Sequence, residues 1–312
     1  MRKYKWLIAV LVAVDVCLLG ALGVFAVKWI NTEKTGEIQT AQESMQNVNT
    51  EAPQNSDPEN TGQDAESVQA QRSEATLKKL LQNAMKPVGE TLYVYGGGWN
   101  KEDTGAGEAA VTIGVSPLWK SFYQSQGAGY DSSQYRYQIE KGLDCSGYVG
   151  WVIYNTLETE NGRDGYVFLA QECADRYSQM GFGTKSPKGT FDDYLPGDIL
   201  SSSSDYHVWI ALGQCSDGSV VLVNSSPPGV RICGTVSSDG TSRSEAVKLA
   251  EKFMSEQFPD WYSKFPDCSK DMGYLTHYDR MRWDLSGNGV LTDPEGYSEL
   301  TAEEVLTELF MG

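Results

Sequence analysis

The longest apolar pattern in the chain is a nearly continuous run over residues 6–30, preceded by basic residues within residues 1–5. A run of this length can span a bilayer as a single helix, although Asp15 inside it weakens the pattern. Because positive charges beside a spanning helix stay in the cytoplasm, we expect a single-pass anchor in the cell membrane with the remainder outside. The alternative is a cleaved signal peptide and a secreted protein, with Val24 and Ala26 as the small residues before the cut.

The pattern changes abruptly over residues 31–75, which contain no aromatic residue and no leucine. This stretch holds nine acidic residues against two basic ones and is rich in Gln, Asn, Thr, Glu and Ser. Such a composition buries too little apolar surface to offset the entropy of ordering. We therefore expect a disordered acidic linker that extends by self-repulsion.

Apolar positions recur with helical spacing in four later segments. The first begins near residue 73 and ends before Pro87, and its apolar face is formed by Leu77, Leu80, Leu81 and Ala84. The second covers residues 145–157 and the third covers residues 244–258. The fourth covers residues 301–310, with Thr301 as its N-cap.

Residues 207–212, 219–224 and 229–232 have the composition and alternation of β-strands. Turn sequences separate them: residues 216–218 lie between the first two, and the pair Pro227-Pro228 lies between the second and third. A helix followed by a run of adjacent strands predicts an α+β fold with an antiparallel sheet.

The 312-residue chain carries a formal charge of −17, which argues against a nucleic-acid partner because its phosphates would repel the protein. Its six cysteines show no CxxC spacing and no cluster with histidine, which argues against a zinc site. A disulfide between Cys215 and Cys233 is one possibility, since both flank one group of strands. The chain has only two histidines, His207 and His277, so a mechanism that needs an imidazole must use one of them.

Cys145 lies where a loop becomes the helix over residues 145–157, between Asp144 and Ser146. Unpaired N–H groups and the helix dipole at such a position stabilise a thiolate, which is the nucleophilic form of cysteine. Ser146 and Gly147 are small and leave room for a substrate carbonyl. The alternative interpretation is a buried structural cysteine at the start of a helix.

His207 begins a strand and shares one face of it with Trp209, so it is either a satisfied structural histidine or a base that faces a cleft. Asn224 ends the next strand, and from there an amide can orient an imidazole through a hydrogen bond. The alternative for Asn224 is an ordinary residue of a strand-end turn. Together the two residues would supply the oriented base that a Cys145 nucleophile needs.

Five short motifs in this order resemble the NlpC/P60 family of cell-wall cysteine peptidases, which is papain-like. The family pattern is Tyr-x-x-Gly-Gly, Asp-Cys-Ser-Gly, Pro-Gly-Asp, His-Val-x-Ile-x-x-Gly and then a polar residue in the following strand. The corresponding segments here are Tyr93–Gly97, Asp144–Gly147, Pro196–Asp198, His207–Gly213 and Asn224–Ser226. Each motif is weak alone, and it is their order that carries the resemblance.

The resemblance implies a papain-like fold in which the sheet packs against the helix that begins at the nucleophile. In such a site Cys145 attacks the substrate carbonyl, His207 acts as general base and then as general acid, and Asn224 orients the imidazole. The family commonly has histidine at the position of Asn224. An asparagine can accept a hydrogen bond from the ring, but it adds no charge.

The resemblance further implies a peptidoglycan endopeptidase that cleaves γ-D-glutamyl bonds of stem peptides through an acyl-enzyme, without a metal or cofactor. Tyr93 corresponds to the family's tyrosine beside the nucleophile, and the other candidate substrate contacts are Asp144, Ser146 and Trp209. The expected partners are peptidoglycan stem peptides and the membrane. The alternative functions are a catalytically idle wall-binding scaffold of a secretion or conjugation apparatus, and an acyltransferase with the same Cys-His pair.

We assign residues 76–285 to the peptidase domain and residues 286–312 to a C-terminal extension. Residues 99–142 separate two motifs that lie much closer together in the family, so we interpret them as an insertion. The insertion forms either a substrate-binding lid or a packed decoration. In the tail, oxygen-bearing residues of segment 284–295 have the spacing of a calcium loop, but Pro294 favours a turn-rich surface loop.

Overall fold

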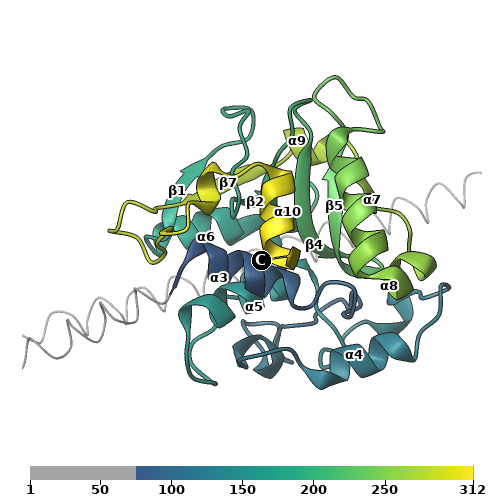
Figure 1. The fold of residues 1–312 in the computed structure, drawn as a ribbon. Coiled ribbons are helices and arrows are strands. Elements are labelled where there is room, and N and C mark those ends of the chain that lie inside the picture. The colour runs from purple at the N-terminus through teal and green to yellow at the C-terminus, as the bar shows by residue number, and fades with distance from the viewer. Residues whose placement is uncertain (1–74, 312) are drawn as a thin grey trace, which may run out of the picture. The chain divides into compact units, whose positions relative to one another are not determined.

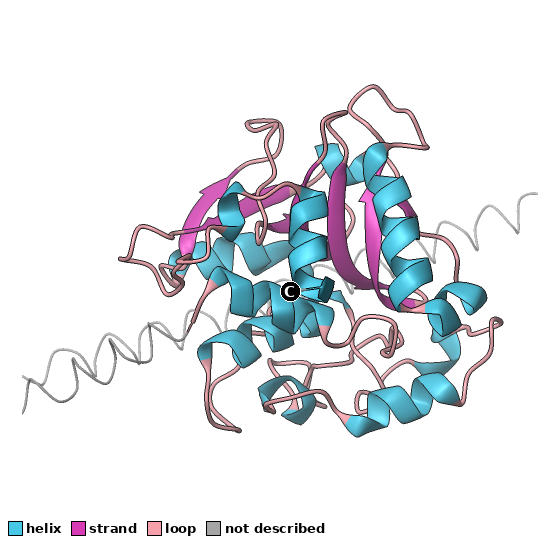
Figure 2. Ribbon diagram, in the orientation of Figure 1, coloured by secondary structure: helices cyan, strands magenta, loops and turns pink. Residues whose placement is uncertain are grey.

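A computed structural model describes residues 75–311, and at their centre lies one mixed sheet of seven strands (Figures 1 and 2). The strands follow the order β1-β7-β2-β3-β4-β5-β6. Their bounds are Gly183–Ser186 (β1), Ile199–Ser202 (β2), His207–Gln214 (β3), Val220–Ser226 (β4), Gly229–Thr235 (β5), Ser269–Lys270 (β6) and Asp279–Trp283 (β7).

The α+β prediction is confirmed, but the expectation of a purely antiparallel sheet is wrong at one edge. Strand β6 pairs with β5 in parallel, whereas the other neighbouring pairs are antiparallel. A parallel pair needs a long crossover connection. Here two helices between β5 and β6 provide it.

Eight α-helices lie within residues 75–311. Their bounds are Leu77–Met85 (α3), Pro117–Gln124 (α4), Cys145–Leu157 (α5), Cys173–Gln179 (α6), Glu245–Gln257 (α7), Pro259–Lys264 (α8), Gly273–Thr276 (α9) and Ala302–Met311 (α10). The four predicted helices are confirmed as α3, α5, α7 and α10. None of the helices in this part of the chain is long and apolar enough to cross a bilayer. The apolar run 6–30 and the linker predicted up to residue 75 fall outside the described residues, except for Ala75.

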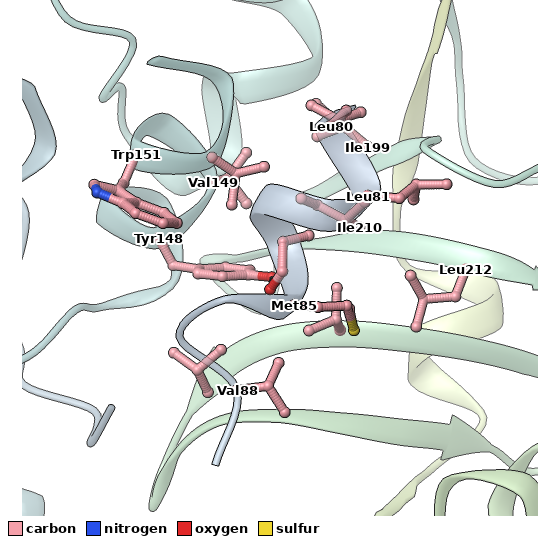
Figure 3. Close-up of a cluster of buried hydrophobic side chains, with 14 of the residues drawn as sticks. Leu80, Leu81, Met85, Val88, Tyr148, Val149, Trp151, Ile199, Ile210 and Leu212 are labelled. Carbon is pink, nitrogen blue, oxygen red and sulfur yellow. Dashed lines mark hydrogen bonds between the residues drawn. The ribbon is translucent and has the colours of Figure 1, made fainter. Parts of the chain in front are cut away.

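Helix α5 forms the middle of the main hydrophobic core, and all of its residues from Cys145 to Thr156 are buried. Figure 3 shows α3 beside α5 over the sheet, and Tyr148 of α5 donates its hydroxyl to the Ala84 carbonyl oxygen of α3 at 2.8 Å. On another side of α5 the ring of Trp151 packs edge-on against that of Trp119, with centroids 5.7 Å apart. Each large apolar side chain buried in this way contributes about 1.5–3 kcal/mol. This packing holds the first turn of α5 at a fixed place above the sheet.

Strand β3 alternates between two apolar clusters. Val208, Ile210 and Leu212 belong to the main core, whereas Trp209 and Ala211 belong to a smaller cluster on the opposite face. This alternation follows from the two-residue period of a strand. The face with Trp209 is the one that His207 shares, so the imidazole lies on the side of the sheet with the smaller cluster.

A disulfide between Cys215 and Cys233 does not form, and both cysteines are free thiols. Cys233 lies in the smaller cluster, whereas Cys215 packs against the main core. The two thiols therefore belong to different faces of the sheet. Flanking the same strand group does not bring two side chains onto the same face.

The tail beyond residue 235 is an integral part of this fold. Helix α7 lies along β5 (Figure 1), and β7 inserts between β1 and β2. Helix α10 contributes Val305 and Leu306 to the main core. The assigned limit between residues 285 and 286 thus falls between two elements that belong to the same packed unit.

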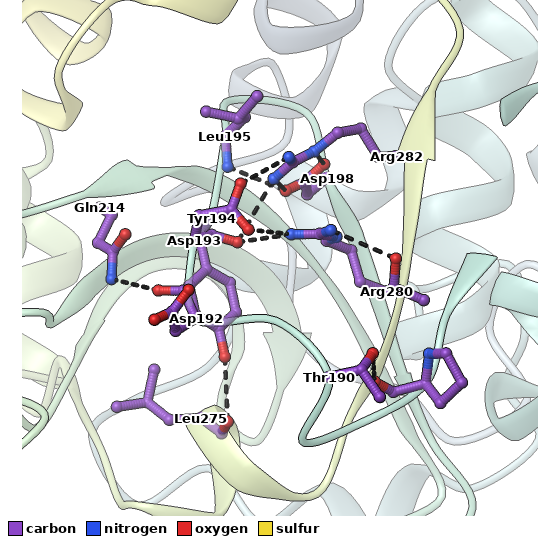
Figure 4. A network of polar contacts seen from close by, with 12 residues as sticks. Thr190, Asp192, Asp193, Tyr194, Leu195, Asp198, Gln214, Leu275, Arg280 and Arg282 are labelled. Carbon is purple, nitrogen blue, oxygen red and sulfur yellow. Dashed lines mark hydrogen bonds and ion pairs between the residues drawn. The ribbon is translucent and has the colours of Figure 1, made fainter. Parts of the chain in front are cut away.

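The Pro-Gly-Asp motif joins β7 to β2 through a buried ion pair (Figure 4). Asp198 is 1% exposed and accepts hydrogen bonds from Arg282 Nε at 2.9 Å and Nη2 at 2.7 Å. Asp198 also accepts one from the Leu195 N–H at 2.9 Å, and the Gly197 carbonyl accepts one from Trp283 Nε1 at 2.8 Å. The motif thereby fixes the entry to β2, the strand that pairs with the start of β3.

Candidate active site

Asp144 holds the first turn of α5 and ties it to the preceding motif. Its Oδ1 accepts hydrogen bonds from the Gly147 N–H at 2.7 Å and the Ser146 hydroxyl at 3.0 Å, and its Oδ2 accepts one from the Gly96 N–H at 3.1 Å. The bond from Gly147 satisfies an N–H that the helix leaves unpaired. Burial raises the pKa of Asp144 to about 6 against the lowering effect of these bonds. Cys145 is therefore the first helical residue after a fixed cap.

Glycines bring the loop over residues 96–98 into backbone contact with α5. A side chain at Gly147 would overlap the carbonyl oxygen of Gly97, and a side chain at Gly98 would overlap Gly147 Cα. Gly98 also has a φ of +91°, in the left-handed region that favours glycine. Trp99 then donates from Nε1 to the Ser146 hydroxyl at 3.0 Å. The first two motifs are thus two halves of one packed unit around the cysteine.

Cys145 is 6% exposed, and its Sγ lies 4.0 Å from the carbonyl oxygen of Tyr206, the residue before His207. The hydrogen bond of the sulfur is therefore to the backbone just before β3, and none joins it to the imidazole. Burial and then the Asp144 carboxylate raise the pKa of the thiol, while the Val208 N–H acts in the opposite direction. The thiol is therefore protonated at neutral pH.

His207 and Asn224 lie on the same face of the sheet. His207 is the first residue of β3, and Asn224 lies on the neighbouring strand β4. The antiparallel pairing of Ile210 with Val223, continued along the strands, sets Asn224 opposite Trp209. Since His207 and Trp209 are two residues apart on β3, all three side chains leave the sheet on one side.

The surroundings of His207 disfavour a positive charge on its ring. Burial and the charge of Lys270 lower the pKa of His207 to about 3, Asn224 raises it through a hydrogen bond, and Arg231 lowers it further. His207 Nε2 and Asn224 Oδ1 are both buried, and neither atom has a hydrogen-bond partner in the described part of the chain. The ring and the amide are thus complementary neighbours, although their atoms fall short of good hydrogen-bond geometry. At neutral pH the imidazole is uncharged.

Two cavities meet at Cys145 and share Tyr93 and Tyr206. We name the first, of about 320 Å³, the aromatic cavity; its other lining residues are Tyr95, Gly96, Trp99, Asp103, Asp144, Ser146, Leu169, Ala170 and Gln171. We name the second, of about 340 Å³, the histidine cavity; its other lining residues are Asp205, His207, Ser226, Pro227, Asp271, Gly273, Tyr274, His277 and Tyr278. A larger cavity of about 400 Å³ between α4 and α8 contains neither Cys145 nor His207, so it lies away from this chemistry.

Three of the candidate substrate contacts line these cavities. Tyr93 lines both, whereas Asp144 and Ser146 line the aromatic cavity. Burial is the largest cause that raises the pKa of Tyr93, so its phenol can donate a hydrogen bond at neutral pH. The structure thus brings Tyr93 next to the cysteine and gives it access to both sides of the site.

Trp209 occupies a different place. It is fully buried and lines neither cavity, and its ring packs against those of Tyr274 and Tyr278 with centroids 6.0 and 5.7 Å away. The segment around α9 covers this face of β3, which leaves no path from Trp209 to a ligand in either cavity. We therefore assign Trp209 to packing beside His207 rather than to substrate contact.

No sequence motif points to Asp205, Tyr206 or His277, which line the histidine cavity. Tyr206 is 68% exposed and has a φ of +50°, which is uncommon for a residue other than glycine. Asp205 and Tyr206 belong to the turn between β2 and β3, whose composition does not reveal the direction of its side chains. For His277 the sequence offers one indication, which is that the chain has only two histidines.

The insertion over residues 99–142 is packed at a few aromatic side chains and is otherwise mostly exposed or half-buried. Trp119 and Tyr123 are buried, and Tyr130 donates its hydroxyl to the Tyr93 carbonyl oxygen at 2.7 Å. Trp99 and Asp103, at its start, line the aromatic cavity. The insertion therefore holds the backbone of Tyr93 through a hydrogen bond and lines part of the aromatic cavity.

Within residues 75–311, no group of three or more His, Cys, Asp or Glu side chains is placed to hold a metal ion. In the segment 284–295, Asp284 accepts from the Ser286 N–H at 2.9 Å. Asp293 accepts from the N–H groups of Tyr297 at 2.9 Å and Ser298 at 2.8 Å. Both carboxylates thus stabilise turns of the surface loop.

No family model, curated protein or solved structure matches this chain. The resemblance to the NlpC/P60 peptidases therefore rests on the five motifs alone. The geometry adds what those motifs do in this chain: they cap the helix of Cys145, pack its first turn and anchor the strand of His207.

Proposed function

We propose that the protein is a papain-like cysteine peptidase of the NlpC/P60 type that cleaves peptide bonds in bacterial cell-wall peptidoglycan. One observation carries the proposal: the Cys145 thiol, at the start of a buried helix, lines the same cavity as the His207 imidazole. Asn224 lies on the adjacent strand and on the same face as His207. A nucleophile, a base and an orienting group are the parts that covalent peptide cleavage needs.

In the proposed mechanism Cys145 is activated as it attacks. The raised pKa of the thiol and the lowered pKa of His207 describe a neutral pair at rest. His207 then removes the thiol proton while the sulfur bonds to the substrate carbonyl carbon, rather than starting from a thiolate–imidazolium pair. The Cys145 N–H lies at the helix start, where the helix offers it no acceptor, and it suits the developing oxyanion.

The two cavities suit the two sides of the scissile bond. The leaving amine must lie next to a group that can protonate it, so the histidine cavity suits the leaving side. The aromatic cavity then suits the acyl side, where Tyr95 and Leu169 are 44% and 47% exposed. The choice of a γ-D-glutamyl bond in stem peptides comes from the family resemblance, as does the absence of a metal or cofactor.

The location of this activity is part of the proposal. The basic residues and apolar run at the N-terminus would hold the enzyme at the outer face of the cell membrane, and the acidic segment would let it reach the wall. There it would remodel the wall or open it locally for a secretion or conjugation apparatus.

A digest of purified peptidoglycan tests the proposal. The full-length protein, a Cys145→Ala variant and a Cys215→Ala variant are each incubated with the polymer, and the soluble products are analysed by mass spectrometry. Cys215 is a free thiol outside both cavities near Cys145, so its variant is the matched control. We expect new stem-peptide fragments from the parent and from Cys215→Ala, but none from Cys145→Ala.

Two other outcomes would favour the alternative functions. Binding to peptidoglycan without fragments would indicate a wall-binding scaffold with an idle site. Modified but uncleaved stem peptides would indicate an acyltransferase. Fragments that appear equally with Cys145→Ala would remove Cys145 from the chemistry and end the proposal.

A further inference from the structure

His277, the second histidine of the chain, lines the same cavity as Cys145 and His207. Its Nδ1 lies 3.0 Å from Asp205 Oδ2 and 3.3 Å from Asp205 Oδ1. The His277 side chain is 50% exposed, so its ring is open to a ligand in the cavity. A carboxylate that binds one ring nitrogen sets the tautomer and leaves the other nitrogen for chemistry.

Two separate segments bring this pair to the site. Asp205 belongs to the turn between β2 and β3, two residues before His207, and its carboxylate also accepts from the Ser202 hydroxyl at 3.2 Å. His277 directly follows α9, whose Tyr274 packs edge-on against the His207 ring with centroids 5.7 Å apart. The same short segment therefore covers one imidazole and presents another to the same cavity.

The two imidazoles have opposite electrostatic surroundings. The charges of Lys270 and Arg231 lower the pKa of His207, and the neutral amide of Asn224 is its orienting group. His277 is bound to the Asp205 carboxylate, and the Asp271 carboxylate lines the same cavity. A carboxylate stabilises the positive charge of an imidazole that holds a proton, and nearby cations destabilise it. The two rings thus differ in their partners, since a carboxylate orients His277 and only a neutral amide lies beside His207.

We propose that His277, bound by Asp205, is a second proton-transfer residue of this site, which protonates the leaving amine and later deprotonates the hydrolytic water. The proposal rests on the peptidase function proposed above. It assigns the removal of the thiol proton to His207, and it divides between two histidines the work that one histidine does in a Cys-His-Asn site.

The proton balance closes over one turnover. In acylation the Cys145 proton moves to His207, the S–C bond forms, and the C–N bond breaks as His277 gives its proton to the amine. His207 is then protonated and His277 is neutral. In deacylation His277 takes a proton from water, the water oxygen bonds to the acyl carbon, and the C–S bond breaks. The leaving sulfur takes the proton from His207, which restores the starting state.

The test separates the steps that need His277 from those that do not. The substrates are the tripeptide L-alanyl-γ-D-glutamyl-L-lysine and the 4-nitrophenyl ester of L-alanyl-γ-D-glutamate. A nitrophenolate leaves without protonation, so ester acylation needs no general acid. Rapid-mixing kinetics of full-length parent and His277→Gln protein give the burst rate of nitrophenolate release, the later steady rate and the rate of tripeptide cleavage.

We expect His277→Gln to reduce tripeptide cleavage and ester deacylation by about 100-fold, the size of effect typical of a general acid or base. The ester burst rate should stay within about threefold of the parent. Asp205→Asn should show the same pattern with a smaller loss. Thr276→Ala is the matched control, because Thr276 is an exposed neighbour on α9 that does not line the cavity, and it should behave as the parent.

Equal losses in all three rates would show that His277 only supports the shape of the site and would overturn the proposal. Unchanged rates would overturn it as well. A parent protein that cleaves neither substrate nor peptidoglycan would instead refute the peptidase function, and the role of His277 with it.

Discussion

Replacement of Arg282 by methionine should expose how strongly the Pro-Gly-Asp motif anchors the sheet. Arg282 binds both oxygens of Asp198 and also Asp193 Oδ2 at 2.6 Å. Asp198 is 1% exposed, so the variant leaves a carboxylate buried without its partner. Breaking a buried pair in this way typically costs about 3–5 kcal/mol. Because the Arg282 side chain is 27% exposed, we take the lower end, about 3 kcal/mol.

The loss of stability should become larger as pH rises, because the burial of Asp198 favours its protonated form. Burial raises the pKa of Asp198, and Arg282 lowers it. Without Arg282 the raised pKa of the folded state rises further, so folding favours the protonated carboxyl. Stability from this group is then fully present below the unfolded pKa, about 3.9, and is lost as pH rises through the folded pKa. The Arg282→Met protein should therefore be closer to the parent at pH 4 than at pH 7.

Urea unfolding followed by circular dichroism measures the loss of stability and its pH dependence. The midpoint temperature of thermal unfolding should fall by about 6–12 °C for a domain of this size. A second Asp198→Asn substitution in the Arg282→Met background removes the unpaired charge and should restore part of the stability. A loss below about 1 kcal/mol at pH 7 would place the pair among weak surface ion pairs and refute the reasoning.

Two further predictions concern Cys145 directly. Gly147→Ala should displace α5 from the Gly97 carbonyl and lower stability by about 1–3 kcal/mol, measured by unfolding. It should also lower the proposed peptidase activity in a cleavage assay. Gly129→Ala, where an added Cβ meets open space, should change neither. Because burial raises the pKa of the Cys145 thiol, the rate at which iodoacetamide alkylates it, followed by peptide mass spectrometry, should rise steadily from about pH 6 to pH 9. A rate independent of pH over this range would reveal a preformed thiolate and contradict a neutral resting pair.

Much of the site could be predicted because its signals are local. Helix α5 has the bounds Cys145–Leu157 that its pattern predicts, since the Asp144 cap and a run of apolar residues act within a few positions of one another. Strand β3 begins at His207 as predicted, with its two-residue alternation intact. Capping and alternation depend on neighbours in the chain, so they can be seen without the fold.

Other features depend on segments that are distant in sequence. The place of β7 between β1 and β2, and the parallel pairing of β6, follow from how the tail returns to the sheet. The tail also brings Tyr274 and His277 to His207, although His207 lies 70 residues before His277 in the sequence. Trp209 looked like a substrate contact because its alternation placed it beside His207, and only the covering segment shows that it is buried.

The amino-acid sequence alone was enough to indicate the α+β class, the helix of Cys145, the strand of His207 and the order of five motifs. These features arise from backbone propensities and side-chain periods that act over a few residues. Tertiary structure alone decided which groups share a cavity with the Cys145 thiol and that Cys215 and Cys233 stay apart. It also decided that the tail contributes Tyr274 and His277 to that cavity. Those outcomes depend on the burial and charge of residues far apart in the chain, and burial is a property of the whole packed fold.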